Sequence, residues 1–183
     1  MSWTRIARRM RVPLGFVFAV LYWWLAHPTA RSIAGGSAVA LIGLAIRAYA
    51  SGYVRKNENL ATTGPYAFTR NPLYLGSIVI AAGFAVMARS WLVVALLGLM
   101  FLAIYLPVIW SEEAYLRERF PEFAEYERRV PRLLPRLGDL LAQRQPSSGG
   151  FSRDLYLQHR EYQALAGTLA MIATVGLKLY WKH

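Results

Sequence analysis

The stretch from Asn71 to Trp110 reads NPLYLGSIVIAAGFAVMARSWLVVALLGLMFLAIYLPVIW and contains one charged residue, Arg89. A helix needs about 20 mostly apolar residues to cross the hydrocarbon core of a bilayer. The stretch is long enough for two such helices, 71–88 and 90–111, separated only by Arg89. Because hydrocarbon offers the backbone no hydrogen-bond partners, spanning segments of this length are expected to be helical. These residues therefore predict an integral membrane protein.

The rest of the chain supports this prediction. Of its 183 residues, 56% are hydrophobic and 17% are charged, whereas soluble domains contain roughly 25% charged residues. Three more apolar segments occur, at 12–30, 32–54 and 162–181. The first is interpreted as a permanent helix, because it lacks the small-residue cleavage site of a signal peptide. The fold class is therefore an all-α integral membrane protein, a bundle of about five transmembrane helices with short cytoplasmic interfacial helices.

Residues 1–183 are expected to form a single membrane domain. Residues 1–142 would contain four helices and the polar motifs, 143–150 a linker, and 151–183 an interfacial segment and the fifth helix. Arg47 lies near the end of the second segment and is expected to snorkel outward. In the fifth helix, Ala166, Ala170 and Thr174 are spaced by four residues, which suits close packing on another helix.

The distribution of basic residues predicts the orientation. With a cytoplasmic N-terminus, all but four of the 21 basic residues lie on the cytoplasmic side; the exceptions are Arg31, Arg89, Lys178 and Lys182. Topology and attraction to anionic lipid then account for most of the net charge of +11, so nucleic acid is not needed as a partner. The tryptophans at predicted outer helix ends fit an aromatic belt: Trp23, Trp24, Trp91 and Trp181.

The composition also excludes several kinds of chemistry. The chain has no Cys, which removes thiolate catalysis, disulfides and Cys-based zinc sites. Its three histidines, His27, His159 and His183, are not grouped as metal ligands, so no metal site is predicted.

Two polar segments on the cytoplasmic side, 55–72 and 111–161, are the candidate location for a site. Asn71-Pro72 marks a helix start, with Asn71 placed to cap the helix and Pro72 at its first position. The free amides there, next to Arg70, favour an anion. The other arginines of this side, including Arg128 and Arg132, are expected to contact lipid headgroups.

The second segment begins with the acidic pair Glu112-Glu113, where a spanning helix leaves the bilayer. Adjacent helical residues point about 100° apart, so the pair does not converge on one metal. Acidic residues close to hydrocarbon are usually paired or functional, although a helix cap is the simpler alternative. An amphipathic stripe follows, which Pro121 is expected to break into two short helices: Leu116, Phe120, Phe123, Tyr126 and Val130.

These residues together resemble a known family. The first part is Gly64-Pro65-Tyr66, then Arg70-Asn71-Pro72-Leu73-Tyr74-Leu75-Gly76; the second is Glu112-Glu113-x-x-Leu116-x-x-x-Phe120, then Tyr126-x-x-Arg129-Val130-Pro131. The order and spacing resemble the isoprenylcysteine carboxyl methyltransferase family, which is related to the phospholipid N-methyltransferases. The resemblance covers about residues 60–137. It implies a membrane enzyme that uses S-adenosylmethionine on the cytoplasmic face and methylates a lipophilic or prenylated acceptor.

The resemblance also implies site residues. Arg70, Glu113 and Arg129 are the predicted catalytic residues, with Arg70 holding the donor carboxylate and Arg129 orienting an anionic acceptor. The predicted cofactor-binding residues are Tyr66, Asn71, Pro72, Tyr74, Glu112, Glu113 and Tyr126. The family usually has His where this chain has Asn71, and Asn cannot titrate near pH 7. A proton-shuttle role at this position is therefore lost.

Two other functions remain open. One is an NADPH-dependent enzyme resembling the membrane sterol reductases, and the other is a non-catalytic membrane protein that keeps the bundle. Within the methyltransferase hypothesis, O-, N- and S-methylation all remain. The absence of an obvious base favours a carboxylate acceptor, while Asn71 favours the phospholipid-methylating relatives. The sequence specifies no oligomeric state.

Overall fold

The computed structural model describes residues 3–54, 59–136 and 150–181, with side chains from residue 13 onward. All regular structure in these residues is helical, as predicted. The helices are α1 (Trp3–Leu25), α2 (Ala30–Ser51), the 3₁₀ turn η1 (Gly64–Ala67), α3 (Pro72–Ala88), α4 (Trp91–Met100), the π-helical turn η2 (Phe101–Tyr105), α5 (Leu106–Arg119), α6 (Phe123–Arg129), α8 (Arg153–Gln158) and α9 (Tyr162–Trp181).

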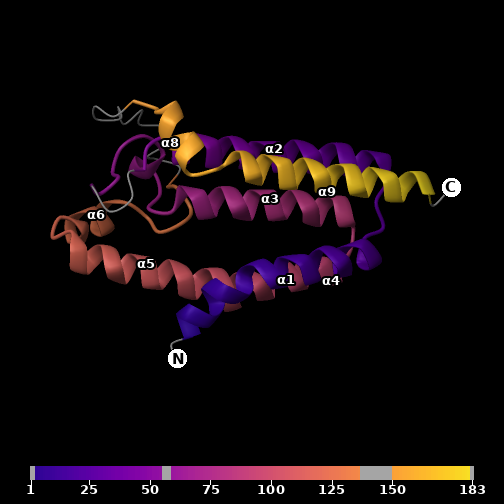
Figure 1. The fold of residues 1–183 in the computed structure, drawn as a ribbon, viewed down its shortest axis with the longest axis horizontal. Helices are drawn as coiled ribbons and strands as arrows, with labels where there is room; N and C mark the ends of the chain where they lie inside the picture. The colour runs from indigo at the N-terminus through magenta and orange to yellow at the C-terminus, as the bar shows by residue number, and fades with distance from the viewer. Residues whose placement is uncertain (1–2, 55–58, 137–149, 182–183) are drawn as a thin grey trace.

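The long helices form two rows (Figure 1). Helices α2, α3 and α9 run side by side in one row, and α1, α4 and α5 form the other. Helices η1, α6 and α8 gather at one end of the bundle, which we call the polar end. The α1–α2 and α3–α4 connections and the C-terminus lie at the opposite end, which we call the apolar end.

Each of the five predicted apolar segments is a helix. Three helical stretches are long and apolar enough to cross a membrane: Ala30–Ser51, Trp91–Arg119 and Tyr162–Trp181. The apolar parts of the other two, Pro13–Leu25 and Pro72–Ala88, are shorter. At 17 residues, α3 is at the lower limit for a span, which is about 17–25 residues. The chain is thus an all-α membrane protein.

The closest helix packing joins α2 and α3. A Cβ atom built on Gly43 would lie 2.7 Å from the carbonyl oxygen of Gly76, and one on Gly83 would lie 2.5 Å from that of Gly36. Only glycine allows the two backbones to approach this closely, which is the small-residue packing common between membrane helices. The α2–α3 pair is therefore the rigid centre of its row.

The prediction that the small residues of the fifth helix form its packing face is wrong. Ala166, Ala170 and Thr174 are all exposed, and α9 instead buries Thr168 and Val175. The reason is that α2 already uses its glycines against α3. Helix α9 instead packs through the face that carries Thr168 and Val175.

The fourth apolar segment extends beyond its predicted end at residue 111. Helices α4, η2 and α5 form one continuous helical stretch to Arg119. Pro107 lies in the first turn of α5, and since proline has no N–H, the regular hydrogen-bond ladder is interrupted there. The π-helical turn at Phe101–Tyr105 directly precedes this interruption. The predicted break at Pro121 is confirmed, because α5 ends at Arg119 and α6 begins at Phe123.

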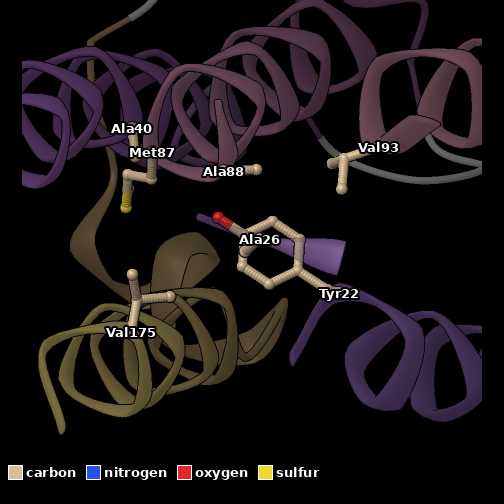
Figure 2. Packing of buried hydrophobic residues seen from close by; sticks show 7 residues of the cluster. All are labelled: Tyr22, Ala26, Ala40, Met87, Ala88, Val93 and Val175. Atoms are coloured by element: carbon tan, nitrogen blue, oxygen red, sulfur yellow. The ribbon is translucent and has the colours of Figure 1, made fainter. Parts of the chain in front are cut away.

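The largest apolar core lies toward the apolar end and joins both rows. Figure 2 shows Tyr22 and Ala26 near Met87, Ala88, Val93 and Val175. The Tyr22 hydroxyl donates a 2.8 Å hydrogen bond to the Phe84 carbonyl, so its polar tip is satisfied inside the core. This core fixes the two rows relative to each other. Most of the predicted linker, residues 143–149, lies outside the described residues.

Candidate functional site

The centre of the polar end is the carboxylate of Glu113. Its side chain is only 3% exposed, and α5 carries it toward the start of α3. It accepts hydrogen bonds from Asn71 Nδ2 at 3.0 Å and from Arg132 Nε at 2.9 Å. Arg70 Nε lies 3.6 Å away. A buried carboxylate is costly unless it is paired and hydrogen-bonded, and here three polar groups surround it.

The contact between Asn71 and Glu113 joins the two polar segments predicted from the sequence. Asn71 occupies the N-cap position of α3 and Pro72 the first helical position, as expected. The expected capping role of the Asn71 side chain is wrong, because it makes no cap hydrogen bond. Its amide instead donates to Glu113 and, at 3.1 Å, to the Arg132 carbonyl. The first turn of α3 consequently has no side-chain cap.

Arg70 is also held inside the cluster. Its guanidinium is 9% exposed, donates from Nη1 to Glu127 at 3.1 Å and lies over the Phe123 ring. Its buried Nε has no hydrogen-bond partner among the described residues, because 3.6 Å to Glu113 is too long for one. An unsatisfied N–H of a buried guanidinium can donate a hydrogen bond to an anionic or carbonyl oxygen of a ligand.

The segment after α6 is hydrogen-bonded to the residues that precede α3. The Arg70 amide donates to the Pro131 carbonyl at 2.9 Å, and the Thr69 hydroxyl donates to the Arg132 carbonyl at 3.2 Å. Arg132 therefore contributes both its carbonyl and its guanidinium to the cluster. The expectation that Arg132 contacts only lipid headgroups is wrong for this reason.

Two buried tyrosines, Tyr66 and Tyr126, lie next to this cluster. The Tyr126 hydroxyl donates a 2.7 Å hydrogen bond to the Tyr66 carbonyl. Burial raises the pKa of both phenols well above the usual range, so neither acts as a base near neutral pH. Tyr126 packs with Phe123 and Val130, as the predicted amphipathic stripe requires. The hydrogen bond between the two tyrosines joins η1 to α6, and their predicted part in cofactor binding stays a prediction.

Three other predicted site residues have surroundings that differ from those of Glu113. Glu112 is half-buried, is close enough to Tyr66 to contribute to its raised pKa, and makes no hydrogen bond or ion pair with another described residue. Tyr74 packs against Tyr105, with ring centroids 6.1 Å apart. Arg129 is 64% exposed and faces Glu125 at 3.6 Å, so the structure does not bring it into the cluster.

A second polar cluster lies beside the first and was not expected from the sequence. Arg47 of α2 forms a two-pronged ion pair with Glu161, with Nη2–Oε1 and Nε–Oε2 distances of 2.7 and 3.0 Å. Its Nη1 also donates to the Ser77 hydroxyl at 2.6 Å and to the Leu73 carbonyl at 3.2 Å. Arg47 therefore does not simply snorkel outward. It connects α2 with the first turns of α3 and with the start of α9.

A cavity of about 810 Å³ extends from this second cluster between the two helix rows. Arg47 and Ser77 lie among its lining residues, and the rest of the lining is mainly apolar side chains of α1, α3, α4 and α9. This volume suits a lipid-like chain or a drug-sized ligand. The polar end thus contains a buried charged cluster, and an apolar cavity extends from the second cluster toward the opposite end of the bundle.

Four residues of these clusters were missed by sequence reasoning: Arg47, Glu127, Arg132 and Glu161. Arg132 could have been found, because it directly follows the Val130-Pro131 motif. Glu127 lies one turn after Phe123 on the same short helix. Arg47 and Glu161 are 114 residues apart, and no local pattern pairs them.

The fold and the clusters define a helical membrane protein with a polar site at one end of its bundle. The family model described as phospholipid methyltransferase matches residues 31–122, half of the chain. The chain therefore belongs to the phospholipid methyltransferase family. The match includes both sides of the Asn71–Glu113 contact, and it confirms the resemblance identified from the sequence.

Two curated proteins are similar to this chain. The "Cobalt-zinc-cadmium resistance protein CzcN" of Cupriavidus metallidurans is 44% identical over 103 residues, covering 56% of this chain and 47% of that protein. The "Nickel-cobalt-cadmium resistance protein NccN" of Alcaligenes xylosoxydans xylosoxydans is 45% identical over 89 residues, covering 49% and 41%. The chain thus matches less than half the length of either relative. No solved structure is significantly similar to it.

The names of these relatives refer to metal resistance. Within residues 3–54, 59–136 and 150–181, no group of three or more His, Asp or Glu side chains is arranged to hold a metal ion. The described polar groups are instead carboxylates paired with guanidinium and amide groups.

Proposed function

We propose that this protein is an S-adenosylmethionine-dependent methyltransferase that acts on a lipophilic acceptor at the polar end of the bundle. The observation that carries the proposal is the contact of Asn71 Nδ2 with Glu113 Oε1 at 3.0 Å. It joins two polar motifs 42 residues apart, in a chain of the phospholipid methyltransferase family. Neither motif alone would argue for an enzyme.

The residues present fit the donor. Its amino-acid part has a carboxylate and an ammonium group, and its ribose has hydroxyls. The uncapped first turn of α3 and the unsatisfied Nε of Arg70 suit the carboxylate. Glu112, which has no described partner, suits the ammonium or the ribose. Glu113 and Arg132 would hold these groups in place.

The bound donor would supply an activated methyl group, which passes to a nucleophilic atom of the acceptor while sulfur keeps the bonding electron pair. Such a transfer needs no metal, thiol or triad in the protein. It needs alignment of the two reactants and exclusion of water. The buried cluster and the apolar cavity provide an environment of that kind. The cavity is the proposed acceptor site, reached from the bilayer.

Among carboxylate, amine and thiol acceptors, the site residues favour one that is already nucleophilic at neutral pH. Asn71 cannot take up a proton in the physiological range, and its amide is already engaged by Glu113. An acceptor that is ionised and ready at neutral pH needs no base from the protein. Arg129 is exposed, and we propose that it binds headgroups rather than the acceptor.

The first experiment is calorimetric titration of the purified protein in detergent with S-adenosylmethionine, with its demethylated product and with NADPH. We expect saturable binding of the first two ligands. Glu112→Gln should weaken binding about tenfold, the loss typical for one charge-assisted hydrogen bond. Because Glu112 has no described partner, this substitution removes a ligand contact and leaves the Glu113 cluster intact.

The matched control is Glu125→Gln, which neutralises an exposed carboxylate of α6 away from the cavity. It should bind the donor like the unmodified chain. Binding of NADPH alone would instead indicate a reductase. Absence of binding by all three ligands, both in detergent and in lipid nanodiscs, would contradict the proposal and favour a non-catalytic protein.

A further inference from the structure

We propose that the Arg47–Glu161 ion pair is a latch that holds α9 as the movable wall of the cavity. When the pair separates, α9 moves away from α2 and α3 and widens the cavity beside Arg47, a cavity that is already partly open. The inference concerns access to the cavity and does not depend on what reaction follows.

The first argument is position. Ala164, Gly167, Thr168 and Met171 of α9 line the cavity over two turns. Displacing this one helix would therefore widen the cavity along its length. Arg47, which also lines the cavity, lies at the polar end of this wall.

The second argument is that α9 is packed less closely than α3, although Val175 and the half-buried Met171 and Ile172 contribute to the apolar core. Among its residues only Thr168 and Val175 are buried, in contrast to the glycine-mediated backbone contact between α2 and α3. Polar contacts hold its two ends instead. Glu161 pairs with Arg47 at one end, and the Lys178 ammonium donates to the Trp23 and Ala26 carbonyls at the other.

The third argument is the break in the chain before α9. Arg160 has a φ of 54°, a left-handed conformation that separates α8 from α9. Helix α8 is anchored separately, since the Ser152 amide donates to the Gly52 carbonyl at 3.0 Å. Helix α9 can therefore pivot at Arg160 without displacing α8.

The geometry of the pair suits a latch. A guanidinium and a carboxylate joined by two parallel hydrogen bonds form a strong contact. The contact is also directional, so it is lost when the two groups move apart or rotate. Arg47 keeps its hydrogen bonds to Ser77 and to the Leu73 carbonyl when Glu161 leaves. The charge of Arg47 thus stays partly compensated in the open state. The same charge would then face the cavity.

The chain contains no Cys, so single introduced thiols can report access. Ala81→Cys places a thiol on α3 within the cavity lining, and Ala170→Cys places one on the exposed face of α9. The measurement is the rate of reaction with a small water-soluble maleimide in lipid nanodiscs. Only thiolates that meet water react quickly.

In the Glu161→Gln background we expect the thiol at position 81 to react about tenfold faster, as for the loss of one charge-assisted contact. The thiol at position 170 should react at an unchanged rate. Glu125→Gln is the matched control, because it removes an exposed carboxylate of α6 and should change neither rate. Arg47→Lys, which keeps the charge but loses the two-pronged contact, should give an intermediate rate at position 81.

An unchanged rate at position 81 in Glu161→Gln would overturn the latch. A parallel rise at positions 81 and 170 would overturn it as well, because Glu161 would then stabilise the whole fold rather than one wall. The assay requires neither donor nor acceptor. A protein that failed to bind S-adenosylmethionine could therefore still confirm the latch, and the two proposals fail separately.

Discussion

At the scale of single residues, the main feature of the polar end is the pairing of its buried charges. Glu113 is almost fully buried and is compensated by Asn71, Arg70 and Arg132. Glu127 extends the network outward, since it bridges Arg70 at 3.1 Å and Arg117 at 2.7 Å. A charge left without its partner in such a place costs more than the pair contributes. The cluster is therefore most sensitive to changes that remove one member alone.

Glu127 allows a prediction about pH. Its hydrogen bond with Arg117 holds the pKa of this carboxyl below its usual range. A pKa that is lower in the folded protein means stabilisation that is complete above the unfolded value of about 4.3 and is lost as pH falls through the folded value. The melting temperature of the protein in detergent should exceed that of Glu127→Gln by a constant amount between about pH 5 and 7.

Below about pH 4 this difference in melting temperature should shrink toward zero, as Glu127 becomes protonated. Thermal unfolding followed by circular dichroism at each pH measures it. Because the Glu127 side chain is partly accessible to solvent, the effect should be modest and should weaken in high salt. A difference that grew on acidification would contradict the assignment.

At the scale of helices, backbone contact between α2 and α3 positions the start of α3. Helix α3 contributes Asn71 at its N-cap, so any separation of the pair displaces the site. Helix α9 depends on side-chain contacts at its ends instead. The same bundle thus contains a closely packed helix pair, α2 and α3, and one helix, α9, whose ends are held by side-chain contacts.

Substitutions at two glycines of α2 can test the close packing of α2 on α3. Gly43→Ala would place a Cβ 2.7 Å from backbone atoms of α3, so the helices must separate, at a cost of about 1–3 kcal/mol. Gly35→Ala, on the same helix, meets nothing within 4 Å and should leave stability unchanged or slightly higher. Thermal unfolding in detergent compares them. Equal stability of the two variants would contradict the close α2–α3 packing.

At the scale of the whole molecule, the two ends of the bundle differ in character. The polar end contains both charged clusters. Of the four exposed tryptophans among the described residues, Trp24, Trp91 and Trp181 lie at helix ends toward the apolar end, and Trp110 lies on α5. The distribution of basic residues predicts that the polar end faces the cytoplasm. In that orientation, the proposed water-soluble methyl donor would reach the candidate site from the cytoplasm.

Single introduced thiols can test the orientation in intact cells. Ser90→Cys lies in the α3–α4 connection and Thr62→Cys in the segment before η1. We expect a membrane-impermeant maleimide to label the thiol at position 90, but not the one at position 62, from outside. Both should be labelled after the cells are lysed, which controls for intrinsic reactivity. Labelling at position 62 in intact cells would show that the polar end faces outward.

The sequence by itself determined the fold class and most of the helices. Long charge-free segments have only one stable solution in hydrocarbon, and Pro72 and Pro121 mark breaks that the backbone cannot avoid. The motifs around Arg70 and Glu112 also indicated the part of the chain that forms the candidate site. Local composition carries this information, because each feature depends on residues close together in the chain.

The tertiary structure decided which of these residues meet. It placed Arg132 in the cluster and left Arg129 outside, although the two are three residues apart. It turned Asn71 from the helix end toward Glu113, and it paired Arg47 with Glu161 across 114 residues. Close packing through small residues occurs between α2 and α3, and not on α9 as the sequence predicted. These contacts depend on how close the helices come, and that distance follows from packing among all of them rather than from any single segment.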